Sequence, residues 1–218
     1  MARGADELAC KPETGSRALL AAALRPVRKL MPAPGASWRD SIPIVAEIRD
    51  AQPGDAHGVA AVNVESWQAA YRGLLPDSVL ANLSVLDRER TWSKILVDPP
   101  PRTAVLLATC DAVVVGFAAV GPGRDSMAAA QAGELYAIYL RPDQWGCGIG
   151  AHLHNAAIHR LSTLGFTHAT LWVLEGNERA ISFYHRNGWA ADGARQVDQG
   201  PDGVELSELR LHRALSAD

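Results

Sequence analysis

A glycine-rich loop between a strand pattern and a helix pattern constrains this fold most. The apolar run 134–140 predicts a strand, and the loop after it holds Gly146, Gly148 and Gly150. A helix pattern follows directly and ends at Gly165, a typical residue just past a helix end. Such a loop presents backbone N–H groups at a helix N-terminus, where glycine lets a phosphate approach closely. We therefore expect this turn to hold a phosphate-bearing ligand, although a glycine-rich turn without any ligand is the alternative.

A second strand and helix follow this unit. The run 169–174 predicts the strand, and Asn177 is a favourable N-cap for a helix over 178–187, which Gly188 stops. The other predicted elements lie on either side: strands at 44–49, 104–109, 112–120, 189–197 and 204–212, and helices at 55–70 and 84–96. The predicted elements come in a telling order: strands first, then alternating strands and helices, then a hairpin. This order indicates an α/β (α+β) chain. We expect a mixed, mostly antiparallel sheet of six to seven strands with helices on both faces.

The same glycines permit another interpretation. Gly146, Gly148 and Ala151 satisfy the dinucleotide fingerprint G-x-G-x-x-A, and Glu175 ends the next strand. That reading makes the chain a dinucleotide-binding oxidoreductase. Residues 141–145 count against it, because they separate the strand from a glycine that should follow it almost directly. The unit also lies late in the chain, without further strand–helix units behind it.

The segment 133–189 resembles the acyl-CoA-binding half of the GNAT superfamily, the N-acetyltransferases that use acetyl-CoA. The superfamily motif is an aliphatic strand end, then Arg or Gln, two variable residues, Gly, one variable residue, and Gly or Ala. Aligned on the glycines, Leu140 is the strand end, and Trp145 departs from the pattern at the Arg or Gln position. Asn177 and Tyr184 match the superfamily's spacing of an Asn, six residues and a Tyr. The resemblance covers about residues 48–213, including a familiar helix and loop over 66–80.

The resemblance implies a fold in which two central parallel strands splay apart and the pantetheine of CoA lies between them. It implies that acetyl-CoA is held by Tyr139, Leu140, Trp145, Gly146, Cys147, Gly148, Ile149, Gly150, Ala151 and Asn177. A primary amine, expected to be that of a small molecule, would attack the thioester directly in a ternary complex. Residues 1–43 would then be a flexible basic extension, 44–213 the N-acetyltransferase domain and 214–218 a C-terminal tail.

Two residues are the implied catalytic groups. Tyr184 is the expected general acid for the CoA sulfur, and Glu134 is the expected base, directly or through water. The structural alternatives are that Tyr184 only packs, that Asn177 only caps its helix, and that Glu134 is a solvated strand end. Cys147 at the helix N-terminus raises the possibility of a thiol nucleophile, but the sequence positions no His or Asp partner beside it. A non-catalytic acyl-CoA-binding module is a further alternative.

Two aromatic residues one helical turn apart, Trp67 and Tyr71, are expected to pair. They are either core residues or part of the acceptor pocket, and the sequence favours neither. The sequence leaves the identity of the acceptor open.

Composition excludes several classes of function. The net charge of −3 gives no basic surplus for nucleic acid, and no apolar run is long enough to span a membrane. The three cysteines are odd in number and widely spaced, which predicts neither a disulfide framework nor a metal site, and makes the cytoplasm the expected location. The helix after the glycine loop carries three histidines that we expect at the surface: His152, His154 and His159. The expectation of a homodimer rests on the resemblance to the superfamily alone.

The first forty residues differ from the rest in charge. They hold seven Lys and Arg against four Asp and Glu, while the remainder of the chain holds 14 against 20. Asp6 and Glu7 precede a short apolar stretch, which argues against a signal peptide.

Overall fold

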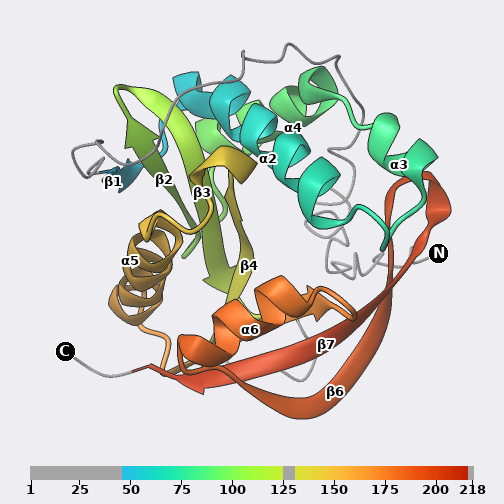
Figure 1. Ribbon diagram of the computed structural model, residues 1–218. Coiled ribbons are helices and arrows are strands. Elements are labelled where there is room, and N and C mark those ends of the chain that lie inside the picture. The colour runs from blue at the N-terminus through green and yellow to red at the C-terminus, as the bar shows by residue number, and fades with distance from the viewer. Residues whose placement is uncertain (1–45, 125–130, 216–218) are drawn as a thin grey trace, which may run out of the picture.

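The computed structural model describes residues 46–124 and 131–215 (Figure 1). The predicted extension over 1–43 lies outside the described residues, as do the first residues of the strand expected over 44–49. Ala214 closes the last strand, and the buried Leu215 donates its backbone N–H to the Thr167 carbonyl oxygen. The folded part therefore continues to Leu215, past the domain end expected at residue 213.

One mixed sheet forms the centre of the described residues, in the spatial order β1-β2-β3-β4-β5-β7-β6. Neighbouring strands are antiparallel except for the parallel pair β4 and β5. The strands are β1 (Glu47–Asp50), β2 (Ala104–Cys110), β3 (Val113–Pro122), β4 (Ala132–Leu140), β5 (His168–Leu174), β6 (Ala190–Gln199) and β7 (Glu205–Ala214). The predicted mixed, mostly antiparallel sheet is confirmed.

The parallel pair separates soon after it begins. Ala132–Glu134 of β4 pairs with 168–170 of β5, and no pairing follows, although β4 runs on to Leu140 and β5 to Leu174. Beyond Glu134 on β4 and beyond residue 170 on β5, the facing edges of the two strands pair with no other strand, although both strands lie in the middle of the sheet. The predicted splay of the two central strands is thus present, and it opens the sheet to a ligand.

A bulge in β4 lies next to this separation. Ala119 of β3 lies opposite Ala137, whereas Val120 lies opposite Leu135, which leaves Tyr136 without an opposite residue. Bulges bend a strand and increase its twist, so this one helps to turn β4 away from β5. The Tyr136 hydroxyl donates a hydrogen bond to the Pro122 carbonyl oxygen at 2.6 Å, which ties the bulge to the end of β3.

Helices cover both faces of the sheet, as predicted (Figure 1). Successive strand residues point to opposite faces; Phe117 of β3 packs in the cluster of α2 and α4 with Trp92, and Ala118 packs with Leu153 of α5. None of the helices in the described part of the chain is both long and apolar enough to span a membrane. The helices are α2 (Ala56–Ala70), α3 (Asp77–Ala81), α4 (Val85–Val97), α5 (Ile149–Thr163) and α6 (Glu178–Arg186).

Local sequence signals explain most helix ends. The Asn177 side chain accepts from the Ala180 N–H at 3.2 Å, which confirms it as the N-cap of α6, and Gly165 follows α5 with a positive φ of 82°. Asp55 precedes α2, but its side chain does not cap the helix. Its carboxylate instead accepts two hydrogen bonds from Arg49, at 2.7 and 2.8 Å, and one from the Gln52 N–H.

One histidine prediction was wrong. His154 lies on the inner face of α5 and is fully buried. Its Nε2 accepts a hydrogen bond from the Trp189 indole Nε1 at 2.8 Å, which satisfies the buried ring nitrogen. Burial lowers the pKa of His154 to about 4, so the ring is neutral near pH 7. His154 therefore joins α5 to Trp189, which lies between α6 and β6, and it is a structural residue rather than a surface one.

Candidate active site

A cavity of about 510 Å³ lies where β4 and β5 separate. Its walls come from the end of α2, the unpaired stretches of both strands, the glycine loop before α5, and α6. Eleven of the fourteen residues predicted for the site line it: Trp67, Tyr71, Tyr139, Leu140, Trp145, Gly146, Gly148, Gly150, Ala151, Asn177 and Tyr184. The other three, Glu134, Cys147 and Ile149, are not among the described residues that line it.

The glycine loop has the backbone geometry of an anion site. Gly146 and Gly148 have φ values of 82° and 84°, which glycine adopts without strain, and Gly148 is the N-cap of α5. A Cβ atom at either position would meet no atom within 4 Å, so this backbone faces open space. The first N–H groups of α5, beginning at Ile149, have no partner within the helix, and they carry its positive dipole end. The loop can therefore hold a phosphate by its backbone, while the buried Ile149 side chain anchors it in the core.

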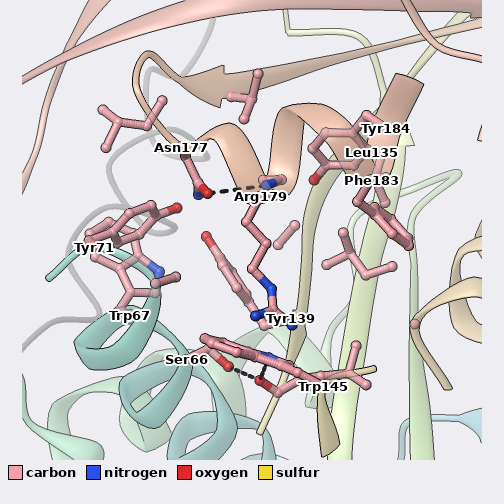
Figure 2. A pocket seen from close by; sticks show the side chains of 18 of the residues that line it. Ser66, Trp67, Tyr71, Leu135, Tyr139, Trp145, Asn177, Arg179, Phe183 and Tyr184 are labelled. Atoms are coloured by element: carbon pink, nitrogen blue, oxygen red, sulfur yellow. Dashed lines mark hydrogen bonds between the residues drawn. The ribbon is translucent and has the colours of Figure 1, made fainter. Parts of the chain in front are cut away.

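Trp145 fixes the start of this loop. Its indole Nε1 donates to the Leu140 carbonyl oxygen at 3.0 Å, and the same oxygen accepts from Ser66 Oγ of α2 at 2.6 Å (Figure 2). The last carbonyl of β4 is thereby bound from both sides. Trp145 departs from the superfamily pattern, but it holds the end of the strand in place by this bond.

A cation that the sequence prediction missed lies on the Trp145 ring. The Arg179 guanidinium carbon is 3.8 Å from the ring centroid, and Arg179 lines the cavity between α6 and the glycine loop (Figure 2). Partial burial lowers the pKa of Arg179, but arginine stays charged at neutral pH. The site therefore has a positive side chain near the glycine loop, whereas the superfamily pattern has its Arg or Gln at the position of Trp145, 34 residues earlier in the chain.

Tyr184 presents its hydroxyl group to the cavity. Its ring is buried between Phe183 and Trp189, and Figure 2 shows the hydroxyl pointing inward. Burial raises the pKa of Tyr184 well above its ordinary value, so the phenol is protonated at neutral pH. The group can donate a proton to an anion that forms in the cavity.

The opposite wall is aromatic. Trp67 and Tyr71 form the expected pair, edge to face with ring centroids 4.7 Å apart. Tyr71 and Tyr139 both line the cavity (Figure 2), and burial raises the pKa of both phenols. Behind this wall the buried Arg88 lies 5.2 Å from the Trp67 ring, and burial lowers its pKa to about 9. This end of the cavity suits an organic molecule that has both apolar and polar parts.

Glu134 lies elsewhere. Its carboxylate is buried in an ion pair with Arg124, whose Nε donates to Oε1 at 3.0 Å and whose backbone N–H donates to Oε2 at 2.9 Å. The alternative interpretation of Glu134 as a solvated strand end is therefore wrong. A carboxylate bound in this way and outside the cavity lining is poorly placed to take a proton from a substrate.

Cys147 is exposed at the outside of the loop, and its Sγ has a weak contact with the Trp145 carbonyl oxygen at 3.9 Å. No cluster of three or more metal-ligating side chains occurs among the residues that the structure describes.

The comparisons with known proteins agree with this geometry. The sequence model of the Acetyltransferase (GNAT) family matches residues 64–189, which include the end of α2, the glycine loop and Tyr184. This chain belongs to the GNAT family of acetyltransferases. The dinucleotide alternative is therefore set aside, and the single parallel strand pair also disagrees with the largely parallel sheet of dinucleotide-binding folds.

Curated relatives and solved structures extend the likeness over most of the GNAT domain. The chain is 32% identical over 165 residues to the uncharacterized N-acetyltransferase YuaI of Bacillus subtilis, which covers 75% of this chain and 90% of that one. The PaiA N-acetyltransferase of Thermoplasma acidophilum, solved in complex with coenzyme A, has a TM-score of 0.60 at 21% identity. The match covers 78% of this chain and 98% of that chain. YncA of Salmonella typhimurium, solved with acetyl-CoA, has a TM-score of 0.59 at 19% identity. The match covers 78% of this chain and 94% of that chain.

Proposed function

We propose that this GNAT protein transfers an acetyl group from acetyl-CoA to a primary amine of a small molecule. The observation that carries the proposal is one continuous cavity that joins the glycine loop, the unpaired edges of β4 and β5, and the Tyr184 hydroxyl. A phosphate-bearing thioester that lies along this cavity has its charged end at the loop and its reactive end near the tyrosine.

The phosphate end would bind at the N-terminus of α5. The N–H groups from Gly148 onward and the helix dipole favour an anion, and Arg179 adds a full positive charge. The open space at Gly146 and Gly148 leaves room for the pyrophosphate. This part of the site fits CoA by charge and shape.

The pantetheine arm would lie in the gap between the splayed strands. Residues Leu135–Leu140 of β4 line the cavity and lack a strand partner on the β5 side, so their backbone groups can pair with amides of the arm. This is β-augmentation, in which an extended ligand takes the place of a strand. It would deliver the thioester to the bulge in β4, where a backbone N–H can stabilise the oxyanion.

The chemistry would proceed by direct transfer. The neutral amine nitrogen attacks the thioester carbonyl carbon, the C–S bond breaks, and Tyr184 gives its proton to the leaving thiolate. The acetylated nitrogen loses one proton, and a proton returns to the Tyr184 phenolate, so the products are a neutral amide, free thiol and the protonated tyrosine. The exposed position of Cys147 outside the cavity lining supports transfer without an acyl-cysteine intermediate.

Release of free thiol from acetyl-CoA, followed across a panel of primary amines, tests this function. We expect turnover with at least one amine and an N-acetylated product by mass spectrometry. Binding of acetyl-CoA without thiol release from any amine would contradict the transferase function and favour the non-catalytic acyl-CoA-binding module. Trapping of an acetyl group on Cys147 would contradict direct transfer.

A further inference from the structure

Arg88 on α4 carries a buried positive charge that no carboxylate of the described residues balances. The residue is only 2% exposed, and its Nε and Nη2 atoms are buried without a hydrogen-bond partner. Burial lowers the pKa of Arg88 to about 9, so the guanidinium stays protonated at neutral pH. Trp92 Nε1 on α4 and Asn63 Oδ1 on α2 are also buried without a partner, but both groups are neutral. A buried charge without a counter-ion is unfavourable, so its presence calls for a chemical reason.

Arg88 lies behind one end of the cavity, the aromatic end, which is lined by Trp67, Tyr71 and Tyr139 (Figure 2). Its guanidinium carbon is 5.2 Å from the centroid of the Trp67 ring. Burial raises the pKa of Tyr139, whereas a hydrogen bond with Tyr71 and the charge of Arg88 oppose that rise. The positive charge of Arg88 therefore acts on the groups that face the cavity, although Arg88 itself does not line it.

The aromatic end also supplies hydrogen-bond donors. The Trp67 Nε1 acts on the Tyr139 hydroxyl, but it is buried without a hydrogen bond of ordinary geometry. An indole N–H can only donate. Burial keeps the phenols of Tyr71 and Tyr139 protonated, so each hydroxyl can donate as well. Three donors in front of a positive charge favour an anion, and a carboxylate, which only accepts hydrogen bonds, fits them.

The other charges of the cavity do not balance Arg88. Glu208 on β7 is the only acidic side chain among the described residues that line the cavity, and its Oε2 accepts from Gln196 Nε2 at 2.7 Å. Its charge acts on both tyrosines but is not among those that act on Arg88. Arg179 and Arg186 on α6 also line the cavity. The described cavity and its aromatic wall thus hold three arginines and one carboxylate, an excess of positive charge.

We propose that the acceptor amine carries a carboxylate, as an amino acid does, and that this carboxylate binds the donors of the aromatic end with the Arg88 charge behind them. This inference rests on the proposed transferase function and narrows its acceptor to aminocarboxylates. Arg88 is a positioning residue, because its charge acts on the carboxylate through the side chains in front of it. The carboxylate stays ionised throughout the transfer, since only the amine nitrogen gains the acetyl group and loses a proton.

Amino acids and their carboxamides test this inference, because each pair shares an amine and a carbon skeleton and differs in the negative charge. We measure kcat and KM for both members of a pair with acetyl-CoA saturating, in the wild type, Arg88→Met and Trp67→Phe. Arg90→Met on the same helix is the matched control, since Arg90 is exposed and does not line the cavity. The unfolding midpoint with and without acetyl-CoA reports folding and cofactor binding.

We expect the wild type to prefer amino acids to their carboxamides. Arg88→Met should raise the KM for the amino acid about tenfold, as for a lost interaction with a charged group, with little change in kcat or in the KM for the carboxamide. Trp67→Phe keeps the ring and removes the N–H, so it should raise the same KM, while Arg90→Met should match the wild type. The unfolding midpoint of Arg88→Met should not fall, because the substitution removes a buried charge without a partner.

A wild type that acetylates amines but does not prefer the amino acids would overturn this inference alone. So would an Arg88→Met variant that binds acetyl-CoA and keeps the wild-type preference, or one with a lowered midpoint and equal losses for both substrates. If Arg88→Met does not fold, an unchanged KM for the amino acid in Trp67→Phe would overturn the inference. A wild-type protein that acetylates no amine would overturn the transferase function, and the role of Arg88 with it.

Discussion

The Arg179 guanidinium carbon lies 3.8 Å from the centroid of the Trp145 ring, and Trp145 stands at the loop position where the superfamily motif has Arg or Gln (Figure 2). The stacked pair brings a positive charge to the glycine loop from α6. We therefore expect Arg179→Ala to raise the KM for acetyl-CoA about tenfold, as for a lost charged hydrogen bond to phosphate, with little change in kcat. Steady-state kinetics with acetyl-CoA varied is the measurement.

Arg90 on α4 is the matched control for this variant, because it is exposed and lies outside the cavity lining. Trp145→Ala should raise the same KM, since Arg179 then loses its support. Expressed as a free energy, the rise in the KM for acetyl-CoA should be smaller in the double variant than the sum of the rises in the two single variants. This is the result for residues that act as a pair. Additive effects would show that the two side chains act independently.

Tyr184→Phe removes one oxygen atom from a buried ring whose hydroxyl faces the cavity. We expect kcat to fall about 100-fold, as for loss of a general acid, and the KM for acetyl-CoA to stay within about twofold. Thermal unfolding of the variant serves as the control for folding. Undiminished turnover in a folded variant would remove Tyr184 from the proposed mechanism.

Glu134→Gln leaves the partly buried Arg124 without its anion. We expect the free energy of unfolding to fall by about 3 kcal/mol, as for a buried ion pair that loses one partner. Because Glu134 does not line the cavity, the pH dependence of kcat should keep its shape in the folded variant. Denaturant unfolding and a pH–rate profile measure the two effects separately, and a displaced profile would restore Glu134 as a candidate base.

His154 makes stability depend on pH below neutrality. Its pKa is about 4 in the folded protein and near 6.5 when unfolded, so between these values the unfolded chain binds more protons. The stabilisation from the neutral ring is complete above pH 6.5 and is lost as the pH falls to 4, by about 3 kcal/mol in total. Denaturant unfolding from pH 4 to 7 should show a smaller slope in His154→Gln, whose amide oxygen can still accept from Trp189. An unchanged slope would contradict this role.

Local signals predicted most of the fold correctly. The Asn177 cap, the positive φ at Gly165 and the alternation of apolar residues along each strand act within a few residues, so they can be read from the chain. The superfamily motif added the splay of β4 and β5, which no local pattern reveals.

The sequence did not reveal the partners of two polar side chains, Glu134 and His154. Glu134 is bound by Arg124, and His154 is bound by Trp189, 35 residues away. Arg179 follows the predicted Asn177 by two residues, and its place beside the N-cap was the one signal that could have found it. Arg88 gave no signal, because its burial behind Trp67 depends on the packing of α4 against α2.

Thermal unfolding in acetyl-CoA, free CoA, NAD and buffer alone tests the central proposal most directly. A ligand that binds only the folded state raises stability by about 2.7 kcal/mol at a hundred times its dissociation constant. We expect acetyl-CoA and CoA to raise the unfolding midpoint clearly, NAD to leave it unchanged, and Arg179→Ala to reduce the CoA shift. A shift with NAD alone, or none with acetyl-CoA, would contradict the assignment of the cavity as an acyl-CoA site.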